Sequence, residues 1–181
     1  MRLFIAIEIP KNVRNEAVRM QTELKNLSLE GRFVPVQNMH ITLSFLGETD
    51  NLPGAVEAMK RAVEGIGPFT LHLGSYSSFI HNNDARTSHI TVKGQLNKLE
   101  NLYESLNAAL YDEGFKTSKK RYVPHITLGR SVVHDEIAES TLKALTPPLN
   151  ASMSVNSIVL FESTRQGKAM VYTPLHRENF R

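Results

Sequence analysis

The tripeptide His-Ile-Thr occurs three times in this chain, at residues 40–42, 89–91 and 125–127. In a β-strand, residues two positions apart lie on the same face, so each copy would present an imidazole beside a hydroxyl. Near neutral pH, a neutral histidine can accept a proton from water and a protonated one can donate a proton to a leaving oxygen. A threonine hydroxyl can donate a hydrogen bond to a phosphoryl oxygen. Two such units facing each other would suit metal-independent acid–base chemistry at a phosphate.

The spacing of the three copies pairs the first with the third and sets the middle copy apart. Isoleucine and threonine are common in ordinary strands, so a single copy has more often a structural than a catalytic role. The first and third copies lie almost half the chain apart, and each follows a predicted helix and precedes a glycine. This favours two similar lobes that each contribute one histidine to a shared cleft. The middle copy follows a polar loop, and we interpret His89 as a structural strand residue that could lie at a sheet edge.

Helical and extended segments alternate along the whole chain. Apolar residues at three- and four-residue steps predict helices at residues 11–27, 53–64, 96–113 and 134–145. Apolar and β-branched runs predict extended segments at residues 2–9, 32–48, 69–76, 88–94, 122–130, 151–164 and 168–175. The last two segments should form a hairpin, and residues 81–87 a polar loop. Several strand pairs look antiparallel, which favours an α+β fold over a doubly wound parallel sheet.

Length and composition indicate one globular domain over residues 1–181. Of the 181 residues, 41% are apolar and 22% charged, and none is cysteine. A disulfide scaffold, a cysteine-ligated zinc site and a thiol nucleophile are therefore excluded. Glu8 and Pro10 interrupt the apolar N-terminus, and no segment approaches the roughly 20 apolar residues of a membrane span. We expect a cytoplasmic, monomeric protein that does not bind membranes.

The balance of charge points weakly to an anionic partner. The formal net charge is +3 and the sequence pI is about 9.2. A basic run precedes the third histidine and consists of Lys116, Lys119, Lys120 and Arg121. This run is either a solvated loop or a phosphate-binding segment.

The flanks of the first and third copies carry a family resemblance. They read "NMHITLSFLGE" and "VPHITLGR", while the chain opens with "RLFIAIEIP" and ends near "FESTRQGKAMVYTPL". In these features the chain resembles the RNA 2′,3′-cyclic phosphodiesterases of the 2H phosphoesterase superfamily, once called 2′-5′ RNA ligases. The family's hallmark is a pair of His-x-Thr-x motifs. The resemblance is weakest over residues 68–95, and Phe33 stands near the place where the family often has a tryptophan.

The resemblance implies a fold and a role for each motif residue. The fold would be two pseudo-symmetric lobes, each an antiparallel sheet backed by helices, around a central cleft. His40 would donate a proton to the leaving oxygen, and His125 would accept one from water. Thr42 and Thr127 would bind the phosphate, and Arg130 would hold the anion or line an RNA groove. The substrate would be an RNA end or nucleotide with a 2′,3′-cyclic phosphate, opened to a 2′-phosphate without metal or other cofactor.

Three other functions stay open at the level of sequence. The histidines could bind a metal, although no H-E-x-x-H or similar spacing is present. The fold could be a non-catalytic module that binds RNA or nucleotides, although such a module would not need both His-Thr pairs. The same histidines could also join or cleave 2′-5′ RNA linkages, because the motif encodes proton transfer and phosphate binding rather than the leaving group. Four aromatic residues could stack on a base, namely Phe4, Phe33, Phe45 and Tyr122.

Overall fold

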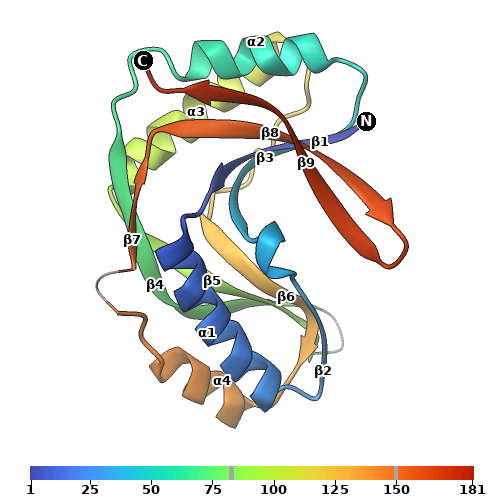
Figure 1. The fold of residues 1–181 in the computed structure, drawn as a ribbon, viewed down its shortest axis with the longest axis vertical. Coiled ribbons are helices and arrows are strands. Elements are labelled where there is room, and N and C mark those ends of the chain that lie inside the picture. Colours follow the sequence, from blue (N-terminus) through green and yellow to red (C-terminus); the bar gives the residue numbers. More distant parts are fainter. Residues whose placement is uncertain (82–83, 149–150) are drawn as a thin grey trace.

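The strands form one curled antiparallel sheet around the middle of the molecule (Figure 1). The computed structural model describes residues 1–81, 84–148 and 151–181, and within them the sheet has nine strands in the order β7-β4-β5-β6-β3-β1-β8-β9, with β2 paired to β6. The strands are β1 Arg2–Glu8, β2 Glu30–Phe33, β3 His40–Glu48, β4 Phe69–Ile80, β5 Arg86–Gly94, β6 His125–Val133, β7 Ser152–Val155, β8 Ser157–Gln166 and β9 Ala169–Asn179. Their pairings are all antiparallel, as predicted.

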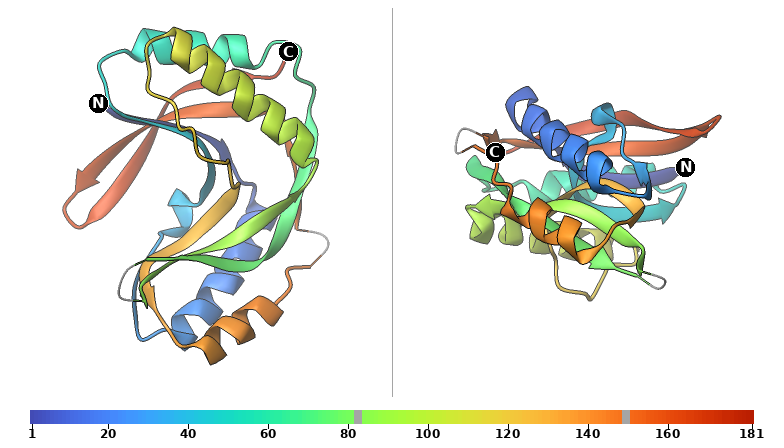
Figure 2. Two further views of the ribbon diagram at one scale, coloured as in Figure 1. Left: turned by 180° about the vertical axis from the view of Figure 1, so that it is seen from behind. Right: turned by 90° about the horizontal axis from the view of Figure 1, so that it is seen from below.

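Two pairs of helices cover opposite ends of this sheet. The helices are α1 Lys11–Leu27, α2 Leu52–Ala62, α3 Leu96–Asp112 and α4 Glu136–Ala144. Helices α2 and α3 pack together beside β3, β8 and β9, whereas α1 and α4 lie against β4, β6 and β7 (Figures 1 and 2). This arrangement confirms the predicted α+β fold with two helix-backed lobes. In the described parts of the chain, no helix has both the length and the apolar character needed to span a membrane.

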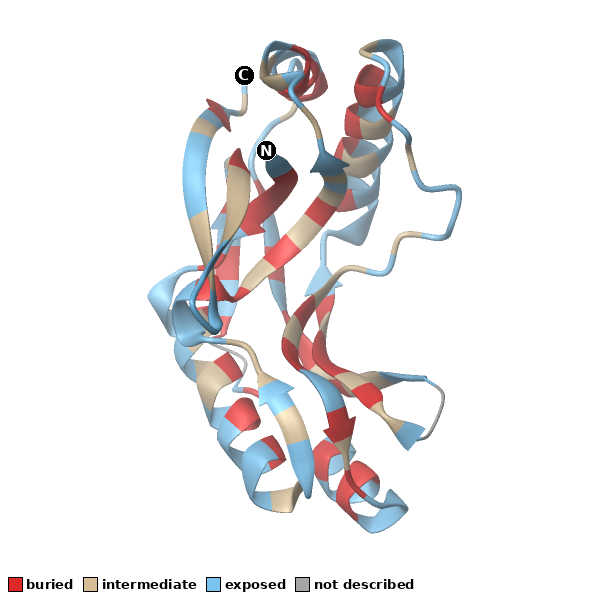
Figure 3. Ribbon diagram, turned by 90° about the vertical axis from the view of Figure 1, so that its right-hand side faces the viewer, coloured by how far each residue is buried: buried red, intermediate tan, exposed pale blue. Residues whose placement is uncertain are grey.

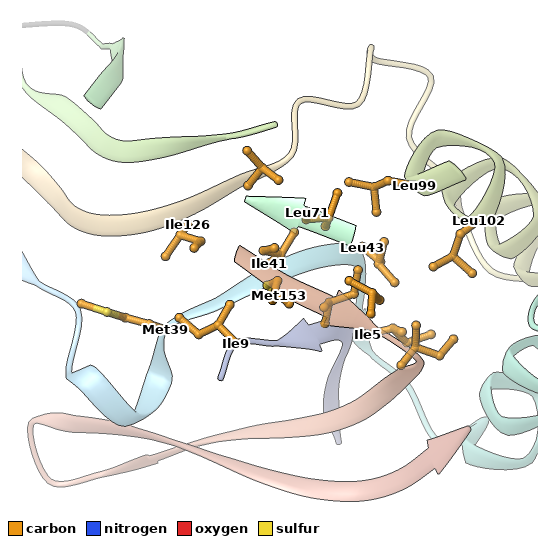
Figure 4. Packing of buried hydrophobic residues seen from close by; sticks show 14 of the residues in the cluster. Ile5, Ile9, Met39, Ile41, Leu43, Leu71, Leu99, Leu102, Ile126 and Met153 are labelled. Atoms are coloured by element: carbon orange, nitrogen blue, oxygen red, sulfur yellow. The ribbon is translucent and has the colours of Figure 1, made fainter. Parts of the chain in front are cut away.

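The two lobes meet at a narrow seam between β3 and β6. A single register pair, Ile41 with Ile126, joins these strands. Both side chains are buried and belong to one apolar cluster that continues into both lobes (Figure 4). Burial alternates along the strands and follows one face of each helix (Figure 3). The core therefore places the two motif strands side by side.

Most predicted elements have the expected positions, and the differences lie mainly at the ends of strands. The expected extended segment over residues 32–48 is interrupted by a 3-10 turn, Val36–Asn38, which the buried Asn38 side chain fixes by donating a 2.9 Å hydrogen bond to the Met170 carbonyl. Strand β6 begins only at His125, directly after Pro124, which has no N–H for a sheet hydrogen bond. The predicted polar loop over residues 81–87 is shorter than expected, because β5 begins at Arg86, and its residues 82 and 83 lie outside the described residues.

Another difference concerns the middle His-Ile-Thr copy. Strand β5 pairs with β4 on one side and with β6 on the other. The interpretation of His89 as a strand residue is correct, but its placement at an edge is wrong. Strand order is a non-local property, and the 17-residue helix α3 separates β5 from β6 in the chain.

Candidate active site

The four predicted motif residues lie together on one face of the seam. Ile41 and Ile126 point into the core, so the residues on either side of each isoleucine point the opposite way. Those residues are His40, Thr42, His125 and Thr127, and all are partly buried. The structure therefore brings both predicted His-Thr units to the same face of the sheet.

Both histidines are held at the same ring nitrogen. His40 Nδ1 lies 2.6 Å from the carbonyl oxygen of Asn38, and His125 Nδ1 lies 2.7 Å from that of Val123. A carbonyl oxygen can only accept, so each Nδ1 carries the proton and donates. In the neutral ring, Nε2 is then the nitrogen that can accept a proton. The backbone two residues before each histidine thus sets the tautomer.

The two units differ at Nε2. His40 Nε2 lies 2.8 Å from the Thr42 hydroxyl oxygen. Among the described residues, neither His125 Nε2 nor the Thr127 hydroxyl has a hydrogen-bond partner. In the free protein, His125 therefore offers an open acceptor while His40 is already paired.

Arg130 reaches the same face because of a β-bulge. In the register between β5 and β6, His89 is opposite Thr127 and Ser88 is opposite Gly129, so Leu128 has no partner. One extra residue in β6 shifts the alternation of side chains. Arg130 is accordingly exposed, whereas strict alternation would have placed it with Ile126 on the core face.

Gly129 permits the close packing at this bulge. A Cβ atom there would lie 2.9 Å from Val132 Cγ2 and 3.1 Å from Phe33 Cδ1. A side chain at residue 129 would therefore push against the neighbours that hold the bulge. The glycine in the "HITLGR" stretch thus helps to bring Arg130 to the site.

Burial is the main factor that lowers the pKa of His40 and of His125. The bond from each Nδ1 to the backbone opposes this and raises the pKa. The charge of Arg130 lowers the pKa of both rings, and His125 lowers that of His40 further. The two histidines and Arg130 are thus electrostatically coupled, as expected for groups that share one site.

Two aromatic rings contact His40. The Phe4 ring centroid lies 5.0 Å from that of His40, and the ring of Tyr172 lies edge-on at 5.6 Å. Phe4 is only 3% exposed, so it packs under the histidine as a core residue and is not available to stack on a base. Tyr172 was not among the predicted site residues, because only the pairing of β9 with β8 brings it here.

The other predicted stacking residues have different environments. The Tyr122 hydroxyl donates a 2.8 Å hydrogen bond to the Thr42 carbonyl, and its ring stacks on Tyr103 at 4.2 Å, so Tyr122 holds the loop before β6 in place. Phe33 is half-buried beside Gly129. Phe45 is 69% exposed and alone among the four offers an open ring face.

The middle tripeptide lies directly beside the third. His89 is 2% exposed, and its ring centroid is 4.9 Å from that of His125. The Thr91 hydroxyl, in contrast, bonds to the backbone of Ser75, accepting from the N–H at 2.9 Å and donating to the carbonyl at 3.2 Å. The middle copy therefore lacks a free hydroxyl but places a third imidazole next to the site.

A small cavity adjoins His40. A small cavity of about 60 Å³ is lined by His40 and Tyr172, and it shares Glu8, Ile9 and Arg14 with a larger cavity of about 530 Å³. The basic run at residues 116–121 lies in the loop between α3 and β6, with its four charged side chains exposed. No group of three or more histidine, aspartate or glutamate side chains within the described ranges is placed to hold a metal ion.

A sequence profile identifies the family. The profile of the 2′-5′ RNA ligase superfamily matches residues 10–167. The chain belongs to this superfamily. The match spans both His-x-Thr-x motifs and ends just after β8, the first strand of the closing hairpin, and it agrees with the resemblance seen in the sequence.

Individual relatives are similar over 72% to nearly all of the chain. A Thermotoga maritima protein named RNA 2′,3′-cyclic phosphodiesterase is 29% identical over 99% of this chain and 96% of its own length. A Methanocaldococcus jannaschii protein of the same name is 33% identical over 72% of this chain and 71% of its own. The structure of Escherichia coli LigT complexed with 3′-AMP superposes with a TM-score of 0.82, at 26% identity over 99% of this chain and 97% of that one. TT0787 of Thermus thermophilus superposes with a TM-score of 0.80, at 27% identity over 100% and 98%.

Proposed function

We propose that this protein hydrolyses 2′,3′-cyclic phosphates at RNA ends or on nucleotides and leaves 2′-phosphates. The observation that carries the proposal is the meeting of two His-Thr units on one face of the β3–β6 seam, with Arg130 coupled to both histidines. Relatives named RNA 2′,3′-cyclic phosphodiesterase that align over nearly the whole chain support the substrate class.

The phosphate is bound by the two threonines and the arginine. Thr42 and Thr127 each donate a hydroxyl hydrogen bond to a non-bridging oxygen, and Arg130 donates charge-assisted bonds. Binding requires the Thr42 hydroxyl to turn from His40 Nε2 toward the phosphate. His40 Nε2 is thereby released to face the leaving oxygen.

The reaction needs one proton acceptor and one proton donor. His125 Nε2 takes a proton from water as the water oxygen forms a bond to phosphorus. The bond between phosphorus and the 3′ oxygen breaks, and that oxygen takes the proton from Nε2 of protonated His40. The products are a 2′-phosphate and a 3′-hydroxyl, and the two histidines have exchanged protonation states. Proton exchange with water restores them.

The bound anion prepares His40 for its role. In the free protein, burial and Arg130 lower the pKa of His40, which opposes protonation. A phosphate anion beside the ring favours the charged imidazole and also offsets the field of Arg130. His125 faces the incoming water, and its lowered pKa keeps it neutral and able to accept.

Joining and cleaving 2′-5′ RNA linkages are the second candidate. The family's name supports this candidate, and the same proton transfers would run through the same two histidines. A non-catalytic binding module would use the threonines and Arg130 but would gain nothing from the two oriented imidazoles.

The decisive experiment uses a short RNA that ends in a 2′,3′-cyclic phosphate, incubated with the protein and EDTA. We expect a 2′-phosphate product, and a 3′-phosphate would overturn the assigned leaving group. His40→Ala and His125→Ala should each lower the rate by about 10²–10⁴-fold. The matched control is His72→Ala, because His72 is exposed on β4 and should not affect the rate. Loss of activity in EDTA that zinc restores would instead indicate a metal-dependent reaction.

We also propose that the protein acts as a cytoplasmic monomer with a single domain over residues 1–181. The cysteine-free sequence is compatible with a reducing compartment. The continuous core cluster, which draws on both lobes, supports a single folding unit. Sedimentation equilibrium and a single calorimetric unfolding transition would test the monomer and the single domain.

A further inference from the structure

His89 repeats the backbone arrangement of the two motif histidines. Its Nδ1 lies 3.4 Å from the carbonyl oxygen of Thr87, two residues earlier, as the other two histidines face the carbonyls of Asn38 and Val123. The contact at His89 is longer and therefore weaker. The three imidazoles are thus presented in the same way from three strands of one sheet.

Three rings form a contact triangle across β4, β5 and β6. Phe79 stacks on His89 with ring centroids 4.4 Å apart, and His89 lies 4.9 Å from His125. Phe79 also meets His125 edge-on at 5.4 Å. In the register, Ser77 is opposite His89 and Thr91 is opposite His125, so each ring contacts its neighbour diagonally. His125 is therefore held by two rings from neighbouring strands.

His89 is placed to touch His125 but not the substrate. It is 2% exposed, whereas Phe79 above it is 38% exposed. Burial, together with His125, lowers the pKa of His89 to about 4, and the contact with the Thr87 carbonyl only partly opposes this. His89 is accordingly neutral at neutral pH and adds no charge beside the base. The charged groups coupled to His125 are then Arg130 and His40.

We propose that His89 is a positioning residue for His125. Together with Phe79 it fixes the imidazole plane so that Nε2 points to the attacking water. The inference rests on the proposed function for the role of His125 as the base. It assigns a task to the middle His-Ile-Thr copy that differs from the task of the other two.

His125 needs an additional restraint because a single hydrogen bond holds its ring. One hydrogen bond at Nδ1 restrains the ring along a single direction, and the terminal torsion of histidine is otherwise broad. His40 has a second bond at Nε2, but His125 has none among the described residues. Aromatic contacts on two sides supply the missing restraint. A displacement of about 1 Å at a reacting group can cost about 10²-fold in rate.

The test compares two replacements of His89. His89→Phe keeps an aromatic ring and removes the nitrogens, and we expect kcat within about threefold of the parent. His89→Ala removes the ring, and we expect kcat to fall at least tenfold with KM changed less than twofold, because the phosphate ligands are untouched. His134→Ala is the matched control, because His134 is also buried in the sheet lobe that contains β6, at 6% exposure, but bonds to Tyr76.

A second measurement does not depend on turnover. NMR of the seven histidines, with His125→Ala for assignment, reports the tautomer and pKa of His125 in the free protein. We expect these signals to change in His89→Ala and to be retained in His89→Phe. Phe79→Leu keeps apolar volume but removes the other ring, and it should produce the same change to a smaller extent. This variant replaces His89→Ala in the comparison if His89→Ala folds poorly.

Three outcomes would overturn the proposal. His89→Ala could lose stability as His134→Ala does while kcat and the His125 signals stay the same, and His89 would then be structural only. His89→Phe could lose as much activity as His89→Ala, and a nitrogen of His89 would then take part in catalysis. The His125 signals could be identical in all variants. If the parent protein does not open the cyclic phosphate, the proposed function fails, while the NMR comparison still decides whether His89 orients His125.

Discussion

Phe45 and Arg130 occupy equivalent places in the two lobes. Each lies five residues beyond a motif histidine. Each also follows a register shift in its strand. For β3 the shift falls between Ile5 and Ala6 of its partner β1, and for β6 it falls between Ser88 and His89 of its partner β5. Both side chains are exposed. A register shift therefore precedes an exposed side chain in both lobes, an aromatic ring on β3 and a guanidinium group on β6. A nucleotide offers a base and a phosphate, and we propose that Phe45 stacks on the base while Arg130 binds the phosphate.

Phe45 is therefore predicted to stack on a base of the substrate. Phe45→Ala should raise KM for a cyclic-phosphate RNA by about 5–150-fold, since base–aromatic stacking is typically worth about 1–3 kcal/mol. The kcat value should change little, because Phe45 reaches His40 only through the ring of Phe4. Phe45→Tyr keeps the ring and should behave as the parent. Equal KM values for Phe45→Ala and the parent would show that the exposed ring is not a substrate contact.

Arg130→Met should change both binding and the pH dependence. Loss of a charge-assisted bond costs about 1.5–3 kcal/mol, so kcat/KM should fall by roughly 10–150-fold. Arg130 lowers the pKa of His40 and His125, and its removal should raise both values. The bell-shaped profile of kcat/KM should therefore move to higher pH.

The control for Arg130 is Arg61→Met. Arg61 lies on α2 and pairs with Asp112 and Glu113. Its removal should leave both the profile and kcat/KM unchanged. A profile for Arg130→Met that stays in place, or moves to lower pH, would contradict the assigned electrostatic coupling.

Local patterns in the sequence were sufficient to predict the helices and the motif faces. Helix α1 spans the predicted residues 11–27, because its buried face recurs with the helical period. The His-x-Thr spacing likewise predicted that His40 and Thr42 share a face, since alternation in a strand is a local rule. The spacing of the two copies suggested that the motifs meet in one cleft, and the family resemblance implied the same arrangement.

Features that depend on strand pairing could not be predicted in this way. Alternation alone puts Arg130 on the core face, and only the register with β5 reveals the bulge that turns it to the site. The contact of His89 with His125 depends on β5 lying beside β6. Tyr172 reaches His40 only through the β8–β9 hairpin. Each of these contacts joins segments that are distant in the chain, and no local pattern encodes them.

The three threonines of the tripeptides should respond differently to replacement by valine. Thr42→Val and Thr127→Val each remove a proposed phosphate donor, and kcat/KM should fall by roughly 10–150-fold in each. Only Thr42→Val should also alter the His40 Nε2 signal in NMR of the free protein, because Thr127 makes no such bond.

Thr91→Val is the matched control within the same tripeptide. The Thr91 hydroxyl bonds to the Ser75 backbone, so its loss should destabilise the fold by about 1 kcal/mol and leave kcat/KM unchanged. A loss of activity in Thr91→Val comparable with that in Thr127→Val, in a folded protein, would mean that the middle copy also binds phosphate.

Acid should destabilise the parent protein in part through His89. Its pKa is about 4 in the folded state and about 6.5 when unfolded, so between these values the unfolded chain binds more protons. The contribution of neutral His89 to the free energy of unfolding is therefore complete above about pH 6.5 and is lost as the pH falls to about 4. The loss is at most about 3 kcal/mol. His40 and His125 add losses of the same sign, because their pKa values are also lowered.

Urea unfolding of the parent and of His89→Phe at pH 7, 5.5 and 4 isolates the contribution of His89 to this loss of free energy. We expect the difference in free energy between the two proteins to shift in favour of His89→Phe as the pH falls. A difference that stays constant over this range would show that the pKa of His89 is not lowered in the folded protein.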